Sequence, residues 1–162
     1  GNNITLIDAR RSIIACQRCF SLFGVMLLQL ESQMSNVEML GQAPMASDRL
    51  ARPLSPATRA GDFVFVSGQV PTDEQGQVIV GGIEAQTRQV FERLKQALAL
   101  ADCTLADVAK VSVWLDDARD FGSFNRVYME CFGDHRPARS TVESRLMIDA
   151  KVEMDVTAYK PR

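Results

Sequence analysis

The sequence is poor in the residues that most catalytic sites require. It contains one histidine, His135, and no Gly-x-Ser-x-Gly segment, so a Ser-His-Asp relay would depend on that single side chain without the turn that exposes a serine nucleophile. It also has no glycine-rich phosphate loop. Cys16 and Cys19 form a Cys-x-x-Cys pair, but no second cysteine or histidine pair lies nearby to complete a metal site. The composition therefore disfavours nucleotide-phosphate and transition-metal chemistry, and we predict neither a metal nor a cofactor.

Long apolar runs and a strong charge imbalance are absent as well. The apolar stretch at residues 20–28 is far shorter than the roughly 20 residues that a transmembrane helix needs, so we predict no membrane span. The net charge of -2 indicates no general basic surface and argues against nucleic acid as the main partner. Four cysteines in a chain of this length do not form the pattern of a secreted disulfide framework, and we expect a cytoplasmic protein.

The apolar content is sufficient for one domain. The 162 residues are 46% hydrophobic and 23% charged, which allows a sizeable core but makes a second domain unnecessary. Residues 1–44 are predicted to form an N-terminal leader, with a helix between Ile13 and Leu27 and then a linker that contains Gly41 and Pro44. Residues 45–162 are predicted to form the folded domain, and Met45 is a candidate for the native start.

The periodicity of apolar residues predicts a mixed α+β domain. The expected order is three strands, a helix, a strand, a helix and two strands, which indicates one mixed sheet with both helices packed on one face. A turn at residues 73–76 predicts that the strand before it forms a hairpin with the strand after it. The predicted strands are at 63–67, 77–80, 108–115, 135–143 and 151–159. The predicted helices are at 83–101 and 120–132, with Asp120 as an N-cap, Gly133 as a stop and a capping box at 104–107.

Two charged residues in the last quarter of the chain are candidates for a binding site. Alternation along residues 138–143 places Arg139, Thr141 and Glu143 on one face of a strand. An arginine on a rigid strand offers a planar fork that matches a carboxylate, although an ion pair with Glu143 would be a purely structural use of the same charge. In the last strand Glu153 alternates with apolar residues, so we expect it to point away from the core.

The second helix carries a polar residue on its apolar side. Phe121, Phe124, Tyr128 and Phe132 form the predicted buried stripe, and Asn125 falls inside it. A buried amide needs hydrogen-bond partners, which would be either a nearby backbone group or the ligand of a pocket. The residues alone favour neither.

The face of the sheet opposite the helices is expected to be mixed in character. We assign to it, in part, Ser67, Trp114, Arg139, Thr141 and Glu153. A face with this mixture of polar and apolar groups is poorly suited to solvent, so we expect neighbouring subunits to cover it in a closed ring.

Five segments carry a recognisable family pattern: 66–71, 85–90, Asn125 with Tyr128 and Phe132, 137–143 and 151–153. Together they resemble the Rid (YjgF) family over roughly residues 52–160. The resemblance implies a chorismate-mutase-like fold and a homotrimer with three sites at the subunit interfaces. It further implies hydrolysis of 2-imino and 2-enamino acids to 2-oxo acids and ammonia without metal or cofactor, as by a 2-iminobutanoate/2-iminopropanoate deaminase.

The resemblance also assigns roles to individual residues. Arg139 matches the arginine that binds the substrate carboxylate, and Glu153 matches the acid that positions or activates water. A protonated imine carbon is already electrophilic, so positioning the carboxylate and one water beside a base is sufficient chemistry. The remaining matches are Ser67 and Gly68 in the pocket lining, Asn125 at the interface, and Thr141 where the family has a small residue near the substrate.

Two departures from the family pattern leave the substrate open. Leu54 stands where the deaminase branch usually has a tyrosine, and residues 144–150 form a loop that is one residue shorter and lacks the usual proline. The alternatives are a related deaminase, such as an aminomuconate-type enzyme, and a non-catalytic trimeric binder of small carboxylates. Ribonuclease activity would require a basic groove that this composition does not indicate.

Overall fold

A computed structural model describes residues 37–41 and 53–162 of the chain. The predicted leader helix, the Cys16–Cys19 pair and Met45 lie outside the described residues. Part of the predicted linker is inside them and differs from the prediction, because Val37–Leu40 forms a strand, β1, that pairs antiparallel with β2 (Ala57–Ala60). Within the described ranges no helix is long and apolar enough to cross a bilayer.

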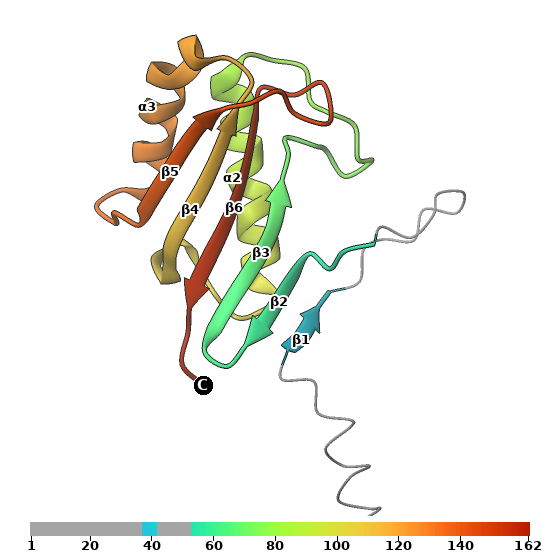
Figure 1. The fold of residues 1–162 in the computed structure, drawn as a ribbon, viewed down its shortest axis with the longest axis vertical. Coiled ribbons are helices and arrows are strands. Elements are labelled where there is room, and N and C mark those ends of the chain that lie inside the picture. The colour runs from blue at the N-terminus through green and yellow to red at the C-terminus, as the bar shows by residue number, and fades with distance from the viewer. Residues whose placement is uncertain (1–36, 42–52) are drawn as a thin grey trace, which may run out of the picture. The chain divides into compact units, whose positions relative to one another are not determined.

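The described strands form one mixed six-stranded sheet (Figure 1). Its order is β1-β2-β3-β6-β4-β5, so the last strand of the chain lies in the middle of the sheet. Only β4 and β5 run parallel to each other, and they are joined through a helix, as a parallel connection requires. The bounds of the other strands are β3 Phe63–Gln69, β4 Val108–Leu115, β5 Ala138–Glu143 and β6 Val152–Tyr159.

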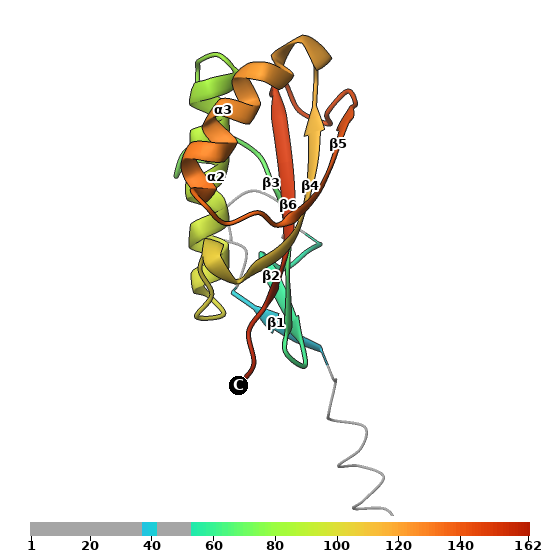
Figure 2. The same cartoon turned by 90° about the vertical axis from the view of Figure 1, so that its left-hand side faces the viewer.

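Two α-helices among the described residues, α2 (Ile83–Ala99) and α3 (Phe121–Phe132), cover one face of this sheet (Figure 2). Each helix is amphipathic and turns its apolar side toward the strands. The sheet contributes the opposite wall of the core, because alternate residues of β6 from Val152 to Ala158 are buried. The largest fully buried side chains include Phe91, Leu94, Leu98, Val111, Val113, Phe124, Val127 and Met154. The α+β architecture predicted from the sequence is therefore confirmed.

Three local predictions need correction. The segment 77–80 is not a strand, since it contributes only an isolated bridge between Thr72 and Val78. Asp120 does not cap α3 with its side chain, because a short 3₁₀ turn, η2 (Ala118–Asp120), precedes that helix and the Asp120 carboxylate pairs instead with Lys151 at 3.3 Å. Phe121, which was predicted to be buried, is 42% exposed, whereas Val127 on the same helix is fully buried in the core. The capping box between Thr104 and Asp107 is confirmed.

Candidate functional site

Strand β5 places Arg139 on the helix side of the sheet. The parallel register pairs Arg139 with Val111 and Thr141 with Val113, and both valines face the core. Arg139 therefore extends toward α3 rather than toward the uncovered face. Its Cζ lies 4.5 Å from the centroid of the Tyr128 ring, and 5.6 Å and 5.7 Å from the rings of Phe124 and Phe121. Cation–π contacts with three rings hold the half-buried guanidinium at the β5 edge.

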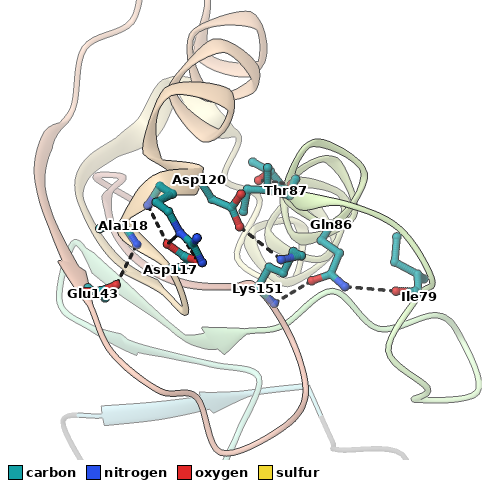
Figure 3. Close-up of polar contacts among 10 residues, drawn as sticks. Ile79, Gln86, Thr87, Asp117, Ala118, Asp120, Glu143 and Lys151 are labelled. Carbon is teal, nitrogen blue, oxygen red and sulfur yellow. Dashed lines mark hydrogen bonds and ion pairs between the residues drawn. The ribbon is translucent and has the colours of Figure 1, made fainter.

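The structural alternative for Arg139, an ion pair with Glu143, does not occur. The Glu143 carboxylate accepts a hydrogen bond of 2.9 Å from the backbone N–H of Ala118, as Figure 3 shows. Among residues 37–41 and 53–162, Arg139 has only its ring contacts and no hydrogen-bond or ion-pair partner. The fork is therefore free to bind an anion from outside the described chain.

Two hydroxyl groups near Arg139 are also without partners. Tyr128 is 7% exposed, and its Oη is buried without a hydrogen bond to any described residue. Thr141 Oγ1 is buried and unpaired in the same part of the chain. Burial raises the pKa of Tyr128, and the nearby positive charge of Arg139 lowers it by a smaller amount, so the phenol stays protonated at neutral pH.

Asn125 lies on the same helix as Tyr128 but is only half-buried. Its side chain makes no hydrogen bond within the described part of the chain, so the backbone contact considered from the sequence is not formed. Tyr128, Arg139 and Thr141 form what we call the arginine cluster, on α3 and β5, and Asn125 lies on the same helix as Tyr128.

Glu153 belongs to a second group of residues, on β3 and β6. Alternation against the buried Val152 and Met154 places Glu153 on the uncovered face of the sheet, as predicted. Burial raises the pKa of this carboxyl group above its usual value of 4.5, and the neighbouring charge of Asp155 raises it further. In the described structure Glu153 has no hydrogen-bond or ion-pair partner, so its carboxylate is available to hold water.

The Ser-Gly segment of β3 lies beside this carboxylate. The pairing of β3 with β6 is irregular between Val66 and Gln69. Such an irregularity changes the direction in which the side chains within it point. Gly68 here approaches so closely that a Cβ at this position would clash with Glu153 Oε1. The Ser67 hydroxyl donates a 2.6 Å hydrogen bond to the carbonyl of Ser55, which anchors the segment. We call Ser67, Gly68 and Glu153 the glutamate cluster.

The two clusters are not brought together within one chain. Trp114 of β4 pairs with Glu153 on one side and with Val142 on the other, so Glu153 shares a face with Val142. Arg139 and Thr141 alternate with Val142 and lie on the opposite, helix-covered side. The assignment of Trp114 and Glu153 to the uncovered face is correct, whereas that of Arg139 and Thr141 is wrong; Ser67 lies in the irregular part of β3, where alternation assigns no face. The wrong assignment arises because strand alternation groups residues without saying which group faces the helices.

A cavity of about 520 Å³ lies outside both clusters. Its wall is held by Gln86, which donates to the carbonyl of Ile79 at 3.2 Å and accepts from the backbone N–H of Lys151 at 2.8 Å (Figure 3). None of the residues predicted for the site lines this cavity. The lining residues are Gln77, Val78, Ile79, Val80, Gly81, Gln86, Asp116, Asp149, Ala150 and Lys151.

Other predicted features are placed as follows. Leu54, which stands where a tyrosine was expected from the resemblance, is 52% exposed ahead of β2.

Sequence reasoning missed the hydroxyl of Tyr128 as a polar feature, because the helical period assigned the whole side chain to the core. In the part of the chain that is described, no group of three or more histidine, cysteine, aspartate or glutamate residues is arranged to hold a metal ion.

A mixed six-stranded sheet with two helices on one face defines an α+β domain of the YjgF/L-PSP fold. The sequence model of the family described as Endoribonuclease L-PSP matches residues 45–160. The chain therefore belongs to this family, whose members are also named RutC and Rid proteins.

Relatives with known names or structures support this membership. The 3-aminoacrylate deaminase RutC of Acinetobacter baylyi is 41% identical over 109 residues, which cover 66% of this chain and 86% of that protein. The crystal structure of yeast Mmf1 matches with 35% identity and a TM-score of 0.70, over 76% of this chain and 98% of that one. The structure of Escherichia coli TdcF with bound serine matches with 31% identity and a TM-score of 0.67, over the same shares of the two chains.

Proposed function

We propose that this protein is a cytoplasmic homotrimeric deaminase that hydrolyses reactive 2-imino and 2-enamino acids to 2-oxo acids and ammonia. The observation that carries the proposal is the Arg139 guanidinium, which three aromatic rings hold in place and which no described residue neutralises. A fixed, unpaired arginine fork is suited to a small carboxylate.

A site at the subunit interface would unite the two clusters. Arg139 and Glu153 face opposite sides of one sheet, so a single subunit supplies only one of the two charges to any one site. In a closed ring each subunit presents the same two surfaces, and the α3–β5 edge of one copy can lie against the uncovered face of the next. Exposed aromatic side chains on that face, Phe63, Phe65 and Tyr159, favour its burial by a second copy.

The proposed reaction needs little from the protein beyond position and one base. Arg139 would bind the substrate carboxylate and fix the imine carbon near the carboxylate of Glu153. Glu153 would take a proton from water as the water oxygen bonds to the carbon of the protonated imine and the C=N π electrons move to nitrogen. Glu153 would then pass this proton to the nitrogen. Cleavage of the carbon–nitrogen bond releases ammonia, and the hydroxyl group gives its proton back to Glu153 as it becomes the carbonyl of the 2-oxo acid; that proton leaves with the ammonia as ammonium. The raised pKa of Glu153 supports its role as a base, because it makes the group a better proton acceptor.

Two relatives support the choice of substrate class. RutC of Acinetobacter baylyi is named for deamination of 3-aminoacrylate, a small enamino acid. TdcF was crystallised with serine, whose carboxylate is of the kind proposed for Arg139. The net charge of -2 gives no reason to prefer RNA, although the family description names an endoribonuclease.

The proposal is tested by generating imino acids with an amino-acid oxidase or a serine/threonine dehydratase and following imine decay and ammonia release. Wild-type protein should accelerate both, and Arg139→Ala should lose the acceleration. Arg88→Ala removes an arginine whose ion pair with Glu130 lies on the helix surface, and it should match wild type. Equal acceleration by wild type and Arg139→Ala would reject the role of Arg139. Saturable binding of 2-oxo acids without turnover of any imine would instead indicate the non-catalytic binder, and a preference for larger imines would indicate an aminomuconate-type substrate.

A further inference from the structure

The arginine cluster contains more hydrogen-bonding capacity than the chain itself uses. Of the three buried side-chain atoms without a partner in the described structure, two are Tyr128 Oη and Thr141 Oγ1. The third is Arg93 Nε on α2, whose side chain already binds Gln96 through Nη1. Buried polar groups are normally hydrogen-bonded, and each exception needs an explanation. Two such exceptions beside an unpaired guanidinium point to a missing ligand.

The chemistry of that ligand follows from the donors. A carboxylate accepts about four hydrogen bonds through its two oxygens, and an arginine fork supplies two of them. Resting on the proposed function, we infer that the Tyr128 and Thr141 hydroxyls donate to the carboxylate that Arg139 binds, so that the three residues form one carboxylate cradle. Thr141 follows Arg139 by one strand period and shares its face, which directs both side chains to the same side of β5.

The tyrosine has two separable functions in this cradle. Its ring supports the guanidinium at 4.5 Å and is held in turn by ring contacts with Phe91, Phe124 and Phe132, at centroid distances of 5.9, 5.6 and 4.7 Å. A phenylalanine would provide all of this packing. The hydroxyl adds nothing that the described chain uses, and its burial without a partner is unfavourable in the unbound protein. Ligand binding would therefore account for the presence of tyrosine at this position.

The experiment compares Tyr128→Phe and Thr141→Val with wild type in two measurements. Calorimetric titration with 2-oxobutanoate gives the dissociation constant for a carboxylate, and steady-state kinetics give KM and kcat for the matching imine. We expect the dissociation constant and KM of each variant to rise about tenfold, as for a lost hydrogen bond to a charged group, while kcat changes little. Thr141→Ser, which keeps a hydroxyl, should recover most of the affinity, and Tyr159→Phe on the other face should bind like wild type.

Stability of the unbound protein separates this role from a structural one. Tyr128→Phe removes an unpaired buried hydroxyl, so its urea midpoint should equal or exceed that of wild type. Unchanged affinity for 2-oxobutanoate in both variants, or a lowered midpoint with unchanged affinity, would overturn the inference while leaving imine hydrolysis intact. If wild type turns over no imine yet both variants bind 2-oxobutanoate more weakly, the cradle stands and the proposed reaction fails.

Discussion

The carboxylate of Glu153 occupies the space next to Gly68 that any larger residue would need. A Cβ on Gly68 would clash with Glu153 Oε1 and would approach Cδ to 3.2 Å. The glycine is therefore explained by a side chain on the neighbouring strand β6. It allows the acid to lie flat against β3 on the uncovered face of the sheet.

Replacing Gly68 should consequently move the proposed base. In Gly68→Ala we expect kcat/KM for imine hydrolysis to fall by about 100-fold, because a displacement near 1 Å is enough to disturb a reacting geometry. Gly82→Ala is a matched control, since nothing lies within 4 Å of a Cβ at that position. The two variants should be compared by initial rates and by circular dichroism. Full activity of Gly68→Ala would show that the position of Glu153 is not critical.

The pH dependence of activity should report the environment of Glu153. Burial first and Asp155 second raise the pKa of Glu153, so the acid limb of kcat/KM should lie above the ordinary value of 4.5. Asp155→Asn removes the like charge and should move this limb to lower pH. Asp62→Asn, in the turn before β3, should leave it in place. An acid limb that does not move in Asp155→Asn would exclude Glu153 as the titrating base.

The raised pKa of Glu153 also makes the stability of the folded protein depend on pH. Because the folded protein has the higher pKa, Glu153 contributes stability below its unfolded pKa, and this contribution is lost as the pH rises through the folded pKa. Glu153→Gln should therefore gain stability relative to wild type at neutral pH and lose this advantage below about pH 4. Urea unfolding at the two pH values, at one protomer concentration, measures the difference. If Glu153→Gln were less stable than wild type at neutral pH, the Glu153 carboxylate would have a stabilising partner, which would contradict its unpaired state in the structure.

A buried arginine away from the site should matter for folding alone. Arg59 is 6% exposed and donates hydrogen bonds of 2.8 Å to the carbonyl of Ala101, just beyond α2, and 3.1 Å to that of Lys160 after β6. Arg59→Met leaves both carbonyls unpaired and should lower the free energy of unfolding by about 2–4 kcal/mol. Arg88→Met breaks only an exposed ion pair, which should cost less than about 1 kcal/mol. Equal urea midpoints for the two variants would refute this role for Arg59.

Much of the fold was predictable because local patterns and tertiary contacts agree. The strand at Val108–Leu115 has the predicted bounds, since three of its alternate residues enter the core. Strand β1 was not predicted, because a run of only four residues before Gly41 becomes a strand only through pairing with β2 across the chain. The segment 77–80 has an apolar composition but lacks a partner strand, and its backbone instead bonds to the preceding loop, as from Ile79 to Pro71.

The candidate site was predictable by residue but not by arrangement. Alternation alone separates Arg139 from Ser140 and Glu153 from its apolar neighbours. The face that each group occupies depends on the register of β5 against β4 and of β4 against β6, which no local pattern contains. The unpaired hydroxyls of Tyr128 and Thr141 likewise appear only once the surrounding partners are known.

The most direct test of the account is complementation between two inactive variants. Arg139→Ala and Glu153→Gln should each be inactive alone. When they are co-expressed at equal levels and purified as mixed trimers through two tags, about one third of the sites should contain both native residues, because each site draws its arginine and its glutamate from different subunits and each mixed trimer has one such pairing among its three interfaces. We predict recovery of about one third of wild-type imine hydrolysis in the mixed rings. Confirmed mixed rings with no recovered activity would contradict a site shared between subunits.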